Sequence, residues 1–394
     1  MKTNSLTPPP DPIAAVTHSD PYPFYADLVK NKPMYYDTQL GVWVASSADA
    51  VKSVLTSNIC RVRPVKEPVP VNLLGSPAAD IYRYLIRMND GDYHQRLKGA
   101  VLACLDQVDM HKLTELSRSW AKTLRPSKHD QRALQDYIFQ LPVYVIASLL
   151  GLPDQVIPRI AAWTNEFVQC FAQNSKTEQI NSGKKAAGEL LGYFRSFMLT
   201  QQVTYSDLLL SILSKQARIR GGEDDNEIIA NGIGFLSQAY EATAGLMGNT
   251  LLAFSSSRIP HEQIITNSDL LRHVIAEVLR YDPPIQNTRR FVAEDGIIAG
   301  KPLREGETIL VVLAAANRDA TVNENPDEFK IHRENRFTFT FGAGPHACPG
   351  KMIAETIAAT GVEQLLISGI DPKSIIGPMI YRPSVNARIP LWTS

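Results

Sequence analysis

The sequence lacks any long apolar run. Its longest apolar stretches are Ile309 to Ala316 and Val143 to Leu150, far short of the roughly 20 residues that cross a bilayer. The first twelve residues, MKTNSLTPPPDP, are polar and proline-rich and hold no apolar core of a secretory signal. The sequence therefore predicts a protein that does not enter a membrane, with the cytoplasm as its expected location.

An excess of charge is also missing, because 40 Lys and Arg residues balance 40 Asp and Glu residues. A nucleic-acid partner requires a clear basic excess, so the balance argues against one. The four cysteines, Cys60, Cys104, Cys170 and Cys348, lie far apart without a CxxC pair. This spacing argues against structural disulfides and a zinc cage, and it favours a reducing compartment.

Repeats, low-complexity tracts and long charged runs are absent, so we expect one domain over residues 13–394 behind a flexible tail over residues 1–12. Residues 131–150 and 187–200 carry apolar side chains at helical intervals. Strand signals are short and mostly peripheral. They cover residues 34–36, 42–45, 288–292, 307–312 and 385–391. The pattern predicts a mainly α fold with minor β structure.

A longer helix is predicted from Glu227 to about Phe254, roughly 40 Å at 1.5 Å per residue. It is apolar on most faces and contains many small residues. These are Gly232, Gly234, Ala239, Ala242, Ala244 and Gly245. Such a helix should be buried, with other groups close to its backbone.

One cysteine has unusual surroundings, in the segment FTFGAGPHACPGKMIA over residues 339–354. Gly342 and Gly344 permit backbone angles denied to other residues and leave room for a flat ligand. A helical pattern begins after Gly350, so Cys348 should lie just before a helix N-terminus, where free N–H groups favour a thiolate. Thiolate is the form of cysteine that binds metal.

The pattern FGxGxHxCxG in this segment resembles the haem-binding loop of the cytochrome P450 family, and the resemblance extends from about residue 20 to the end. It implies a P450 fold in which haem b lies between the long central helix and the cysteine loop. Cys348 would be the iron ligand, with electron donation from sulfur assisting O–O cleavage. Phe341 would pack beside the sulfur, Gly342, Gly350 and Ala239 would contact the haem, and His346 would bond a propionate. Pro349 has no N–H, so the residue after the ligand cannot donate to the sulfur.

Two further motifs agree with the resemblance. Glu277 and Arg280 lie three apart on a helical pattern and can pair, which resembles the ExxR motif of the family, with Arg333 completing a Glu-Arg-Arg cluster. Arg290, His94 and Lys98 match family positions that face the haem propionates. At Lys98 the family usually has Arg, so the charge is kept and the bidentate fork is lost.

The central helix departs from the family pattern [AG]Gx[DE]T[TS]. The acid is present as Glu241, but Ala242 stands where the proton-relay threonine is expected, and Gln238 and Ala239 replace the usual small pair. Three readings are open. A substrate hydroxyl or ordered water takes over the role of the alcohol; Thr243 or the Gln238 amide organises the relay; or the reaction is not a simple hydroxylation.

The resemblance implies a monooxygenase that inserts oxygen into a small organic substrate, a secondary metabolite or xenobiotic. Five regions would line the pocket: residues 64–88, 167–182, 234–242, 285–288 and the C-terminal hairpin. A chain ending at Ser394 has no room for a fused reductase, so we expect a separate ferredoxin and ferredoxin reductase, and a monomer. The alternatives are a desaturase or coupling enzyme, a peroxide-driven peroxygenase, and a haem sensor without catalysis.

Overall fold

The computed structural model describes residues 7–127, 130–171, 175–200, 208–256, 267–373 and 379–392. Helices make up 57% of it and strands 9%, which confirms the mainly α prediction. Contacts divide the chain into two compact units. Unit 1 comprises Met1–Cys60, Gly245–Ala347 and Ile370–Ser394, and unit 2 comprises Arg61–Ala244 and Cys348–Gly369.

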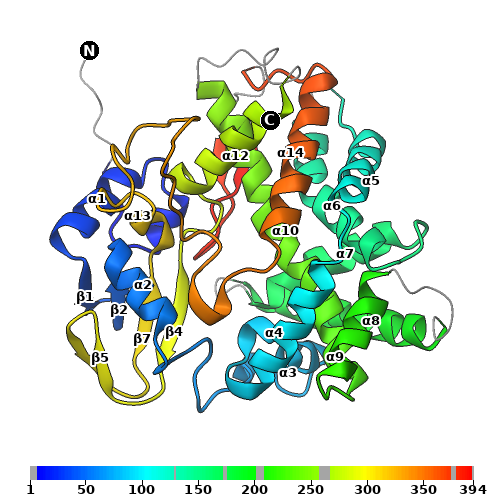
Figure 1. The fold of residues 1–394 in the computed structure, drawn as a ribbon, viewed down its shortest axis with the longest axis horizontal. Coiled ribbons are helices and arrows are strands. Elements are labelled where there is room, and N and C mark those ends of the chain that lie inside the picture. The colour runs from blue at the N-terminus through cyan, green and yellow to red at the C-terminus, as the bar shows by residue number, and fades with distance from the viewer. Residues whose placement is uncertain are drawn as a thin grey trace. The chain divides into compact units, whose positions relative to one another are not determined.

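Unit 1 contains a five-stranded sheet of order β1-β2-β7-β4-β3 (Figure 1). Its strands are β1 (Met34–Asp37), β2 (Val42–Ala45), β3 (Cys60–Arg61), β4 (Thr288–Val292) and β7 (Thr308–Val311). β1 and β2 form the predicted antiparallel hairpin, and β4 and β7, also predicted, pair antiparallel. β2 and β7 run parallel, which joins the hairpin to the later strands.

The remaining strands in the described part of unit 1 form two antiparallel pairs. These are β5 (Gly296–Ile298) with β6 (Lys301–Leu303), and β8 (Met379–Tyr381) with β9 (Pro390–Trp392). The predicted strand over residues 385–391 is shorter than expected and begins only at Pro390. The reason is a turn, because the Ser384 hydroxyl accepts hydrogen bonds from the N–H groups of Asn386 and Ala387.

The helices of unit 1 come before, between and after these strands in the sequence. They are η1 (Ala14–Thr17), α1 (Tyr22–Asn31), α2 (Ala48–Thr56), α12 (Ser268–Tyr281), α13 (Leu313–Ala316) and the short turn η5 (Gly344–His346). Ser47 caps α2 by accepting from the N–H of Ala50. In the predicted tail, residues 1–6 lie outside the described chain, and the Asp11 carboxylate accepts from the N–H groups of Ile13 and Ala14.

Unit 2 is helical. Its elements are η2 (Val71–Leu73), α3 (Pro77–Tyr84), η3 (Ile86–Met88), α4 (Gly91–Leu105), α5 (Met110–Thr123), α6 (Gln131–Leu149), α7 (Ile157–Val168), η4 (Gln169–Phe171), α8 (Thr177–Thr200), α9 (Leu209–Ile219), the first part of α10 (Asp225–Ser256) and α14 (Lys351–Ile367). α14 packs along α5 and α6 (Figure 1). The Tyr137 hydroxyl fixes this packing by donating to the Gly361 carbonyl at 2.8 Å.

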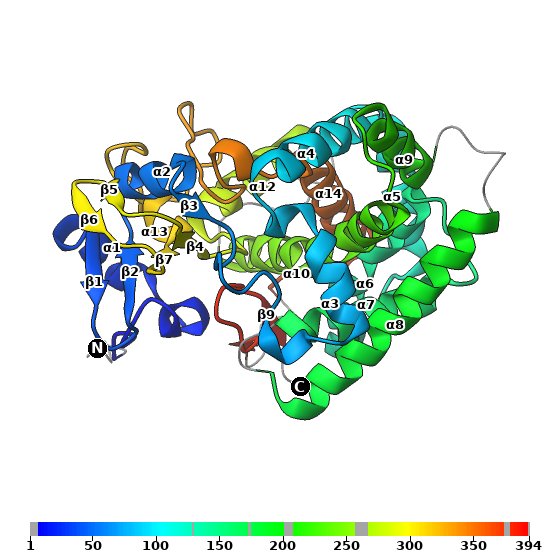
Figure 2. The ribbon, with the colours of Figure 1, turned by 90° about the horizontal axis from the view of Figure 1, so that it is seen from below.

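The predicted helix over residues 187–200 is the second half of α8, which begins ten residues earlier at Thr177. α8 runs beside α7 and α3 (Figure 2). Its first half is polar, so its helical period is weak in the sequence. Contact with η4 holds it, because a Cβ at Gly183 would lie 2.5 Å from the Cys170 sulfur.

The long central helix is α10, and its 32 residues confirm the predicted element. The expectation of close packing is also confirmed. In unit 2, a Cβ at Gly234 would lie 2.9 Å from Leu85 Cδ2, and in unit 1 a Cβ at Gly245 would lie 2.7 Å from Pro284 Cβ. The small residues of α10 are therefore required by their neighbours.

Candidate functional site

The cysteine segment has the local geometry that the sequence predicted. Gly342 and Gly344 have φ angles of +71° and +66°, where other residues are strained. A Cβ at Gly344 would also lie 2.9 Å from the Leu55 carbonyl oxygen. After η5, the chain passes Cys348 and enters α14 at Lys351, so the thiol lies just before a helix N-terminus.

Cys348 is exposed, whereas Cys60, Cys104 and Cys170 are buried, and all four thiols are free. The Gly350 N–H donates to the Cys348 sulfur, so the donor is two residues beyond the predicted ligand. Desolvation by the surrounding protein raises the pKa of the Cys348 thiol. The Gly350 hydrogen bond and the charge of Lys98 oppose this rise. The effect of burial on the thiol pKa is therefore larger than the effect of the helix N-terminus, which was expected to favour the thiolate. A cation bound to the sulfur would lower the pKa again.

The residues present fit a haem iron. Within the described ranges, no group of three or more His, Cys, Asp and Glu side chains could hold a metal ion. A single accessible thiol is sufficient for haem, because the porphyrin supplies the four in-plane ligands and the protein an axial one. Gly350 lies beside the sulfur, since a Cβ there would be in van der Waals contact with it at 3.9 Å.

The predicted propionate ligands lie on three elements. His94 is buried on α4, and Lys98 is one turn later on the same face. Burial lowers the pKa of Lys98, and the Cys348 sulfur raises it, so the ammonium lies near the thiol. Arg290 is buried on β4 and donates to the Arg289 carbonyl at 2.8 Å. His346 ends η5 and, like Phe341, is partly buried. Their roles toward haem stay predictions.

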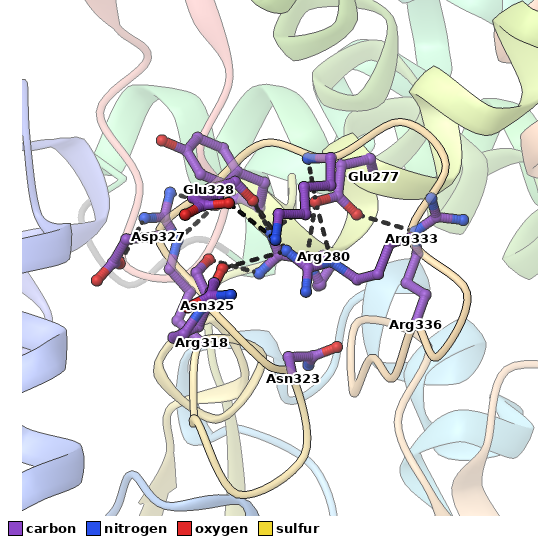
Figure 3. A network of polar contacts seen from close by, with 12 residues as sticks. Glu277, Arg280, Arg318, Asn323, Asn325, Asp327, Glu328, Arg333 and Arg336 are labelled. Atoms are coloured by element: carbon purple, nitrogen blue, oxygen red, sulfur yellow. Dashed lines mark hydrogen bonds and ion pairs between the residues drawn. The ribbon is translucent and has the colours of Figure 1, made fainter.

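The predicted Glu-Arg-Arg cluster is confirmed in unit 1 (Figure 3). Glu277 and Arg280 are fully buried, and Arg280 Nη2 lies 2.7 Å from Glu277 Oε1. Arg333 Nε lies 3.3 Å from the same oxygen. Sequence reasoning missed Arg336, whose Nε lies 2.9 Å from Glu277 Oε2; the signal was a second arginine three residues after Arg333.

The charge of Glu277 is stabilised by these contacts. Burial alone would raise the pKa of this carboxyl. Hydrogen bonds from Arg280, the Lys330 N–H and Arg336 outweigh burial and hold the pKa below its usual range. Arg280 also donates to the carbonyls of Pro326 and Glu328. The cluster therefore ties α12 to the loop before the cysteine segment.

The α10 residues at the family's oxygen-activation positions lie in unit 2. Gln238 is exposed, and Ala239, Glu241 and Ala242 are partly buried. The Gln238 side-chain amide donates to the Gly234 carbonyl at 2.9 Å, so one of its N–H groups is occupied by its own helix. The structure thus leaves Ala242 partly accessible, without the hydroxyl that the family pattern carries there.

Thr243, one residue later, is 1% exposed, and its hydroxyl has no hydrogen-bond partner among the described residues. Other buried helical threonines donate to the carbonyl four residues back: Thr164 to Ile160 at 2.8 Å and Thr250 to Leu246 at 2.7 Å. A buried polar group without a partner is costly, and the Thr243 hydroxyl shares this state with Asn249 Oδ1 on the same helix.

Comparisons with known proteins agree with this geometry. The family model for cytochrome P450 matches residues 228–367. The chain is 24% identical over 354 residues to the biotin biosynthesis cytochrome P450 of Bacillus subtilis (strain 168), covering 88% of each chain. It is 30% identical over 259 residues to the vitamin D(3) 25-hydroxylase of Pseudonocardia autotrophica, covering 65% of this chain and 62% of that protein. The crystal structure of CalO2 superposes with a TM-score of 0.82 and 25% identity, over 97% and 98% of the two chains.

The chain belongs to the cytochrome P450 family. It is accordingly an oxidoreductase, a monooxygenase with a haem-thiolate cofactor that binds a substrate and receives electrons from redox partners. Among the helices in the described ranges, none has the length and apolar character to cross a membrane.

Proposed function

We propose that the chain inserts one oxygen atom from O2 into a small organic substrate, a secondary metabolite or xenobiotic. Its cofactor is haem b, with Cys348 as the axial ligand. A separate ferredoxin and ferredoxin reductase deliver the electrons. The protein acts as a cytoplasmic monomer, and its four free cysteines agree with a reducing compartment. One domain over residues 13–394 behind a tail over residues 1–12 stays part of this proposal.

The proposed haem contacts follow the chemistry of the side chains. Phe341, Gly342, Gly350 and Ala239 offer small or apolar surface to the porphyrin. His94, Lys98, Arg290 and His346 offer donors for the propionates. When bound, the haem supplies the reductive activation of O2. The protein residues hold the haem, exclude water and move protons.

The proton relay of this proposal uses Glu241, Thr243 and Gln238. Glu241 is partly buried on α10 and exchanges protons with solvent, and the Thr243 hydroxyl passes them toward the oxygen. Because Ala242 carries no hydroxyl, a substrate hydroxyl or an ordered water completes the proton relay at this position. The single observation that carries this assignment is the Thr243 hydroxyl, which is buried and has no partner among the described residues.

The test is turnover of the Glu241→Gln variant with a ferredoxin and its reductase. We expect product formation to fall by about 10- to 100-fold, because a positioned proton donor contributes at least that much. Substrate affinity, measured from the haem spin-state change, should stay nearly unchanged. Glu189→Gln, on the exposed face of α8, is the matched control and should turn over normally. Unchanged turnover of Glu241→Gln would refute the relay.

Ala242 also favours a second candidate, peroxide-driven oxidation, because peroxide brings the protons that a relay would otherwise deliver. Adding hydrogen peroxide to enzyme and substrate without redox partners separates the two. Product formation that matches the ferredoxin-supported rate would favour the peroxygenase. A much slower reaction would favour the O2-dependent monooxygenase.

A further inference from the structure

Two histidines lie side by side on the surface of unit 1, outside the cysteine segment. His273 is on α12, and His332 is in the loop between α13 and the cysteine segment; both side chains are exposed. Their ring centroids are 5.3 Å apart, and the ring planes are inclined by 62°. The pair therefore brings two imidazoles together from segments that are far apart in the sequence.

The position of His273 is set by α12. The helix is anchored by its buried face, because Val274 and Ile275 beside His273 are 0% and 1% exposed. Glu277 lies four residues after His273 and so lies one turn along on the same side of the helix. His273 is thus carried next to the carboxylate that organises the Glu277 cluster.

The loop that carries His332 is attached to the same carboxylate on both sides of the histidine. The Lys330 N–H donates to Glu277 Oε1 at 3.0 Å, and Arg333 Nε donates to that oxygen at 3.3 Å (Figure 3). Arg333 also donates to the Glu328 carbonyl at 2.9 Å, which closes the loop on itself. The backbone at His332 therefore has little freedom to move away from α12.

The spacing of the two rings fits a shared metal ion. Neutral imidazole is the commonest metal ligand in proteins and suits zinc, copper and nickel. Two imidazoles that bind one tetrahedral zinc ion, with Zn–N distances of about 2.0–2.1 Å, have ring centroids about 5 Å apart. The observed 5.3 Å is close to this value. Because both backbones are already fixed, binding requires only rotation of the side chains, which keeps its entropy cost low.

The positive charges closest to the pair in sequence have partners of their own or are exposed to solvent. The Lys330 ammonium lies 2.8 Å from Glu328 Oε2, and the Arg333 guanidinium is directed at Glu277. Arg272 adjoins His273, but consecutive residues of a helix do not face each other, and its exposed charge is screened by solvent. Repulsion of an arriving cation by these groups is therefore weak.

We propose that His273 and His332 bind one divalent transition-metal ion of the zinc type, with water molecules as the other ligands. Two protein ligands agree with the finding that no group of three or more occurs in the described ranges. Magnesium, which prefers oxygen ligands, should not bind. The ion would join the loop to α12 and stabilise the folded protein by mass action. The site is independent of the proposed function, because neither histidine is a predicted haem contact.

The test is calorimetric titration of Zn²⁺ into the haem-loaded full chain, prepared without a polyhistidine tag. We expect one ion per chain, and no binding of Mg²⁺. His273→Ala and His332→Ala should each weaken Zn²⁺ binding by about tenfold or more. The double variant should bind no more weakly than either single variant, because two ligands of one ion do not act additively. Zn²⁺ should raise the midpoint of thermal unfolding of the wild type and not of these variants.

His111→Ala is the matched control, because it removes an exposed histidine from α5, where the ring lies 3.7 Å from Glu115; it should bind Zn²⁺ as the wild type does. Absence of Zn²⁺ binding to the wild type would overturn the proposal, as would wild-type affinity in both single variants. Losses that add in the double variant would show two separate sites and would also overturn it. An equal loss in His111→Ala would assign the binding to surface histidines in general.

Discussion

The buried polar cluster around Glu277 and the polar groups near residue 241 of α10 differ in how completely their hydrogen bonds are satisfied. The Glu277 carboxylate accepts from three arginines and one backbone N–H, all within 3.3 Å. In unit 2, the Thr243 hydroxyl has no hydrogen-bond partner among the described residues. The Glu277 carboxylate is therefore fully hydrogen-bonded, whereas the Thr243 hydroxyl keeps an unused donor.

Structural and functional polar groups differ in whether their hydrogen bonds are satisfied within the protein. A saturated cluster such as that of Glu277 stabilises one conformation and has nothing to offer a ligand. A buried group without a partner is costly to the fold, and in the proposed function a proton pathway accounts for the Thr243 hydroxyl. Substitutions in the first region should therefore change stability, and those in the second should change chemistry.

The largest expected effect belongs to Glu277→Gln. Removing this charge leaves Arg280 buried without an anionic partner, which should lower the free energy of unfolding by about 3–5 kcal/mol. Guanidinium denaturation followed by circular dichroism measures the loss. Glu334→Gln, at an exposed position of the same loop, is the control and should change little. A Glu277→Gln protein as stable as the wild type would contradict the structural role of the Glu277 cluster.

The pH dependence of this effect has a definite sign. The folded pKa of Glu277 lies below its ordinary value. Its stabilisation is therefore fully present above the unfolded pKa of about 4.3 and is lost as pH falls through the folded pKa. The stability difference between the wild type and Glu277→Gln should be constant from about pH 6 to 8 and shrink below about pH 4.3. A difference that grows on acidification would contradict the assigned charge state.

Thr243→Val tests the unsatisfied side with a smaller expected effect. Removing a buried hydroxyl without a partner should leave stability unchanged or raise it by up to about 1 kcal/mol. Turnover with ferredoxin should nevertheless fall severalfold. The matched control is Thr250→Val, whose hydroxyl donates to Leu246; it should lose about 1 kcal/mol of stability and keep its turnover. The reverse pattern would show that Thr243 is a packing residue.

The smallest expected effect is that of Pro349→Leu. Pro349 withholds one N–H from the Cys348 sulfur, and the donor in the structure is Gly350. Adding an N–H should withdraw electron density from the sulfur and raise the haem reduction potential. Spectroelectrochemical titration of both proteins measures this shift. An unchanged or lower potential in the variant would contradict the argument.

The cysteine segment and the main elements could be predicted because their signals are local. Positive φ angles at Gly342 and Gly344 and the helix start after Gly350 depend on residues adjacent in sequence. Arg333 was predicted through the family resemblance, whereas no local pattern marks Arg336 as a second partner of Glu277, which is 59 residues away. The unpartnered state of the Thr243 hydroxyl could not be predicted either, because it depends on how the residues around α10 pack.

In the proposed function, Cys348 alone provides the axial thiolate. The most direct measurement is the carbon monoxide difference spectrum of the reduced protein and of four single Cys→Ser variants. We expect the red-shifted Soret band of a thiolate-bound haem in the wild type and in Cys60→Ser, Cys104→Ser and Cys170→Ser. We expect no such band in Cys348→Ser. A red-shifted band that persists in Cys348→Ser would contradict it.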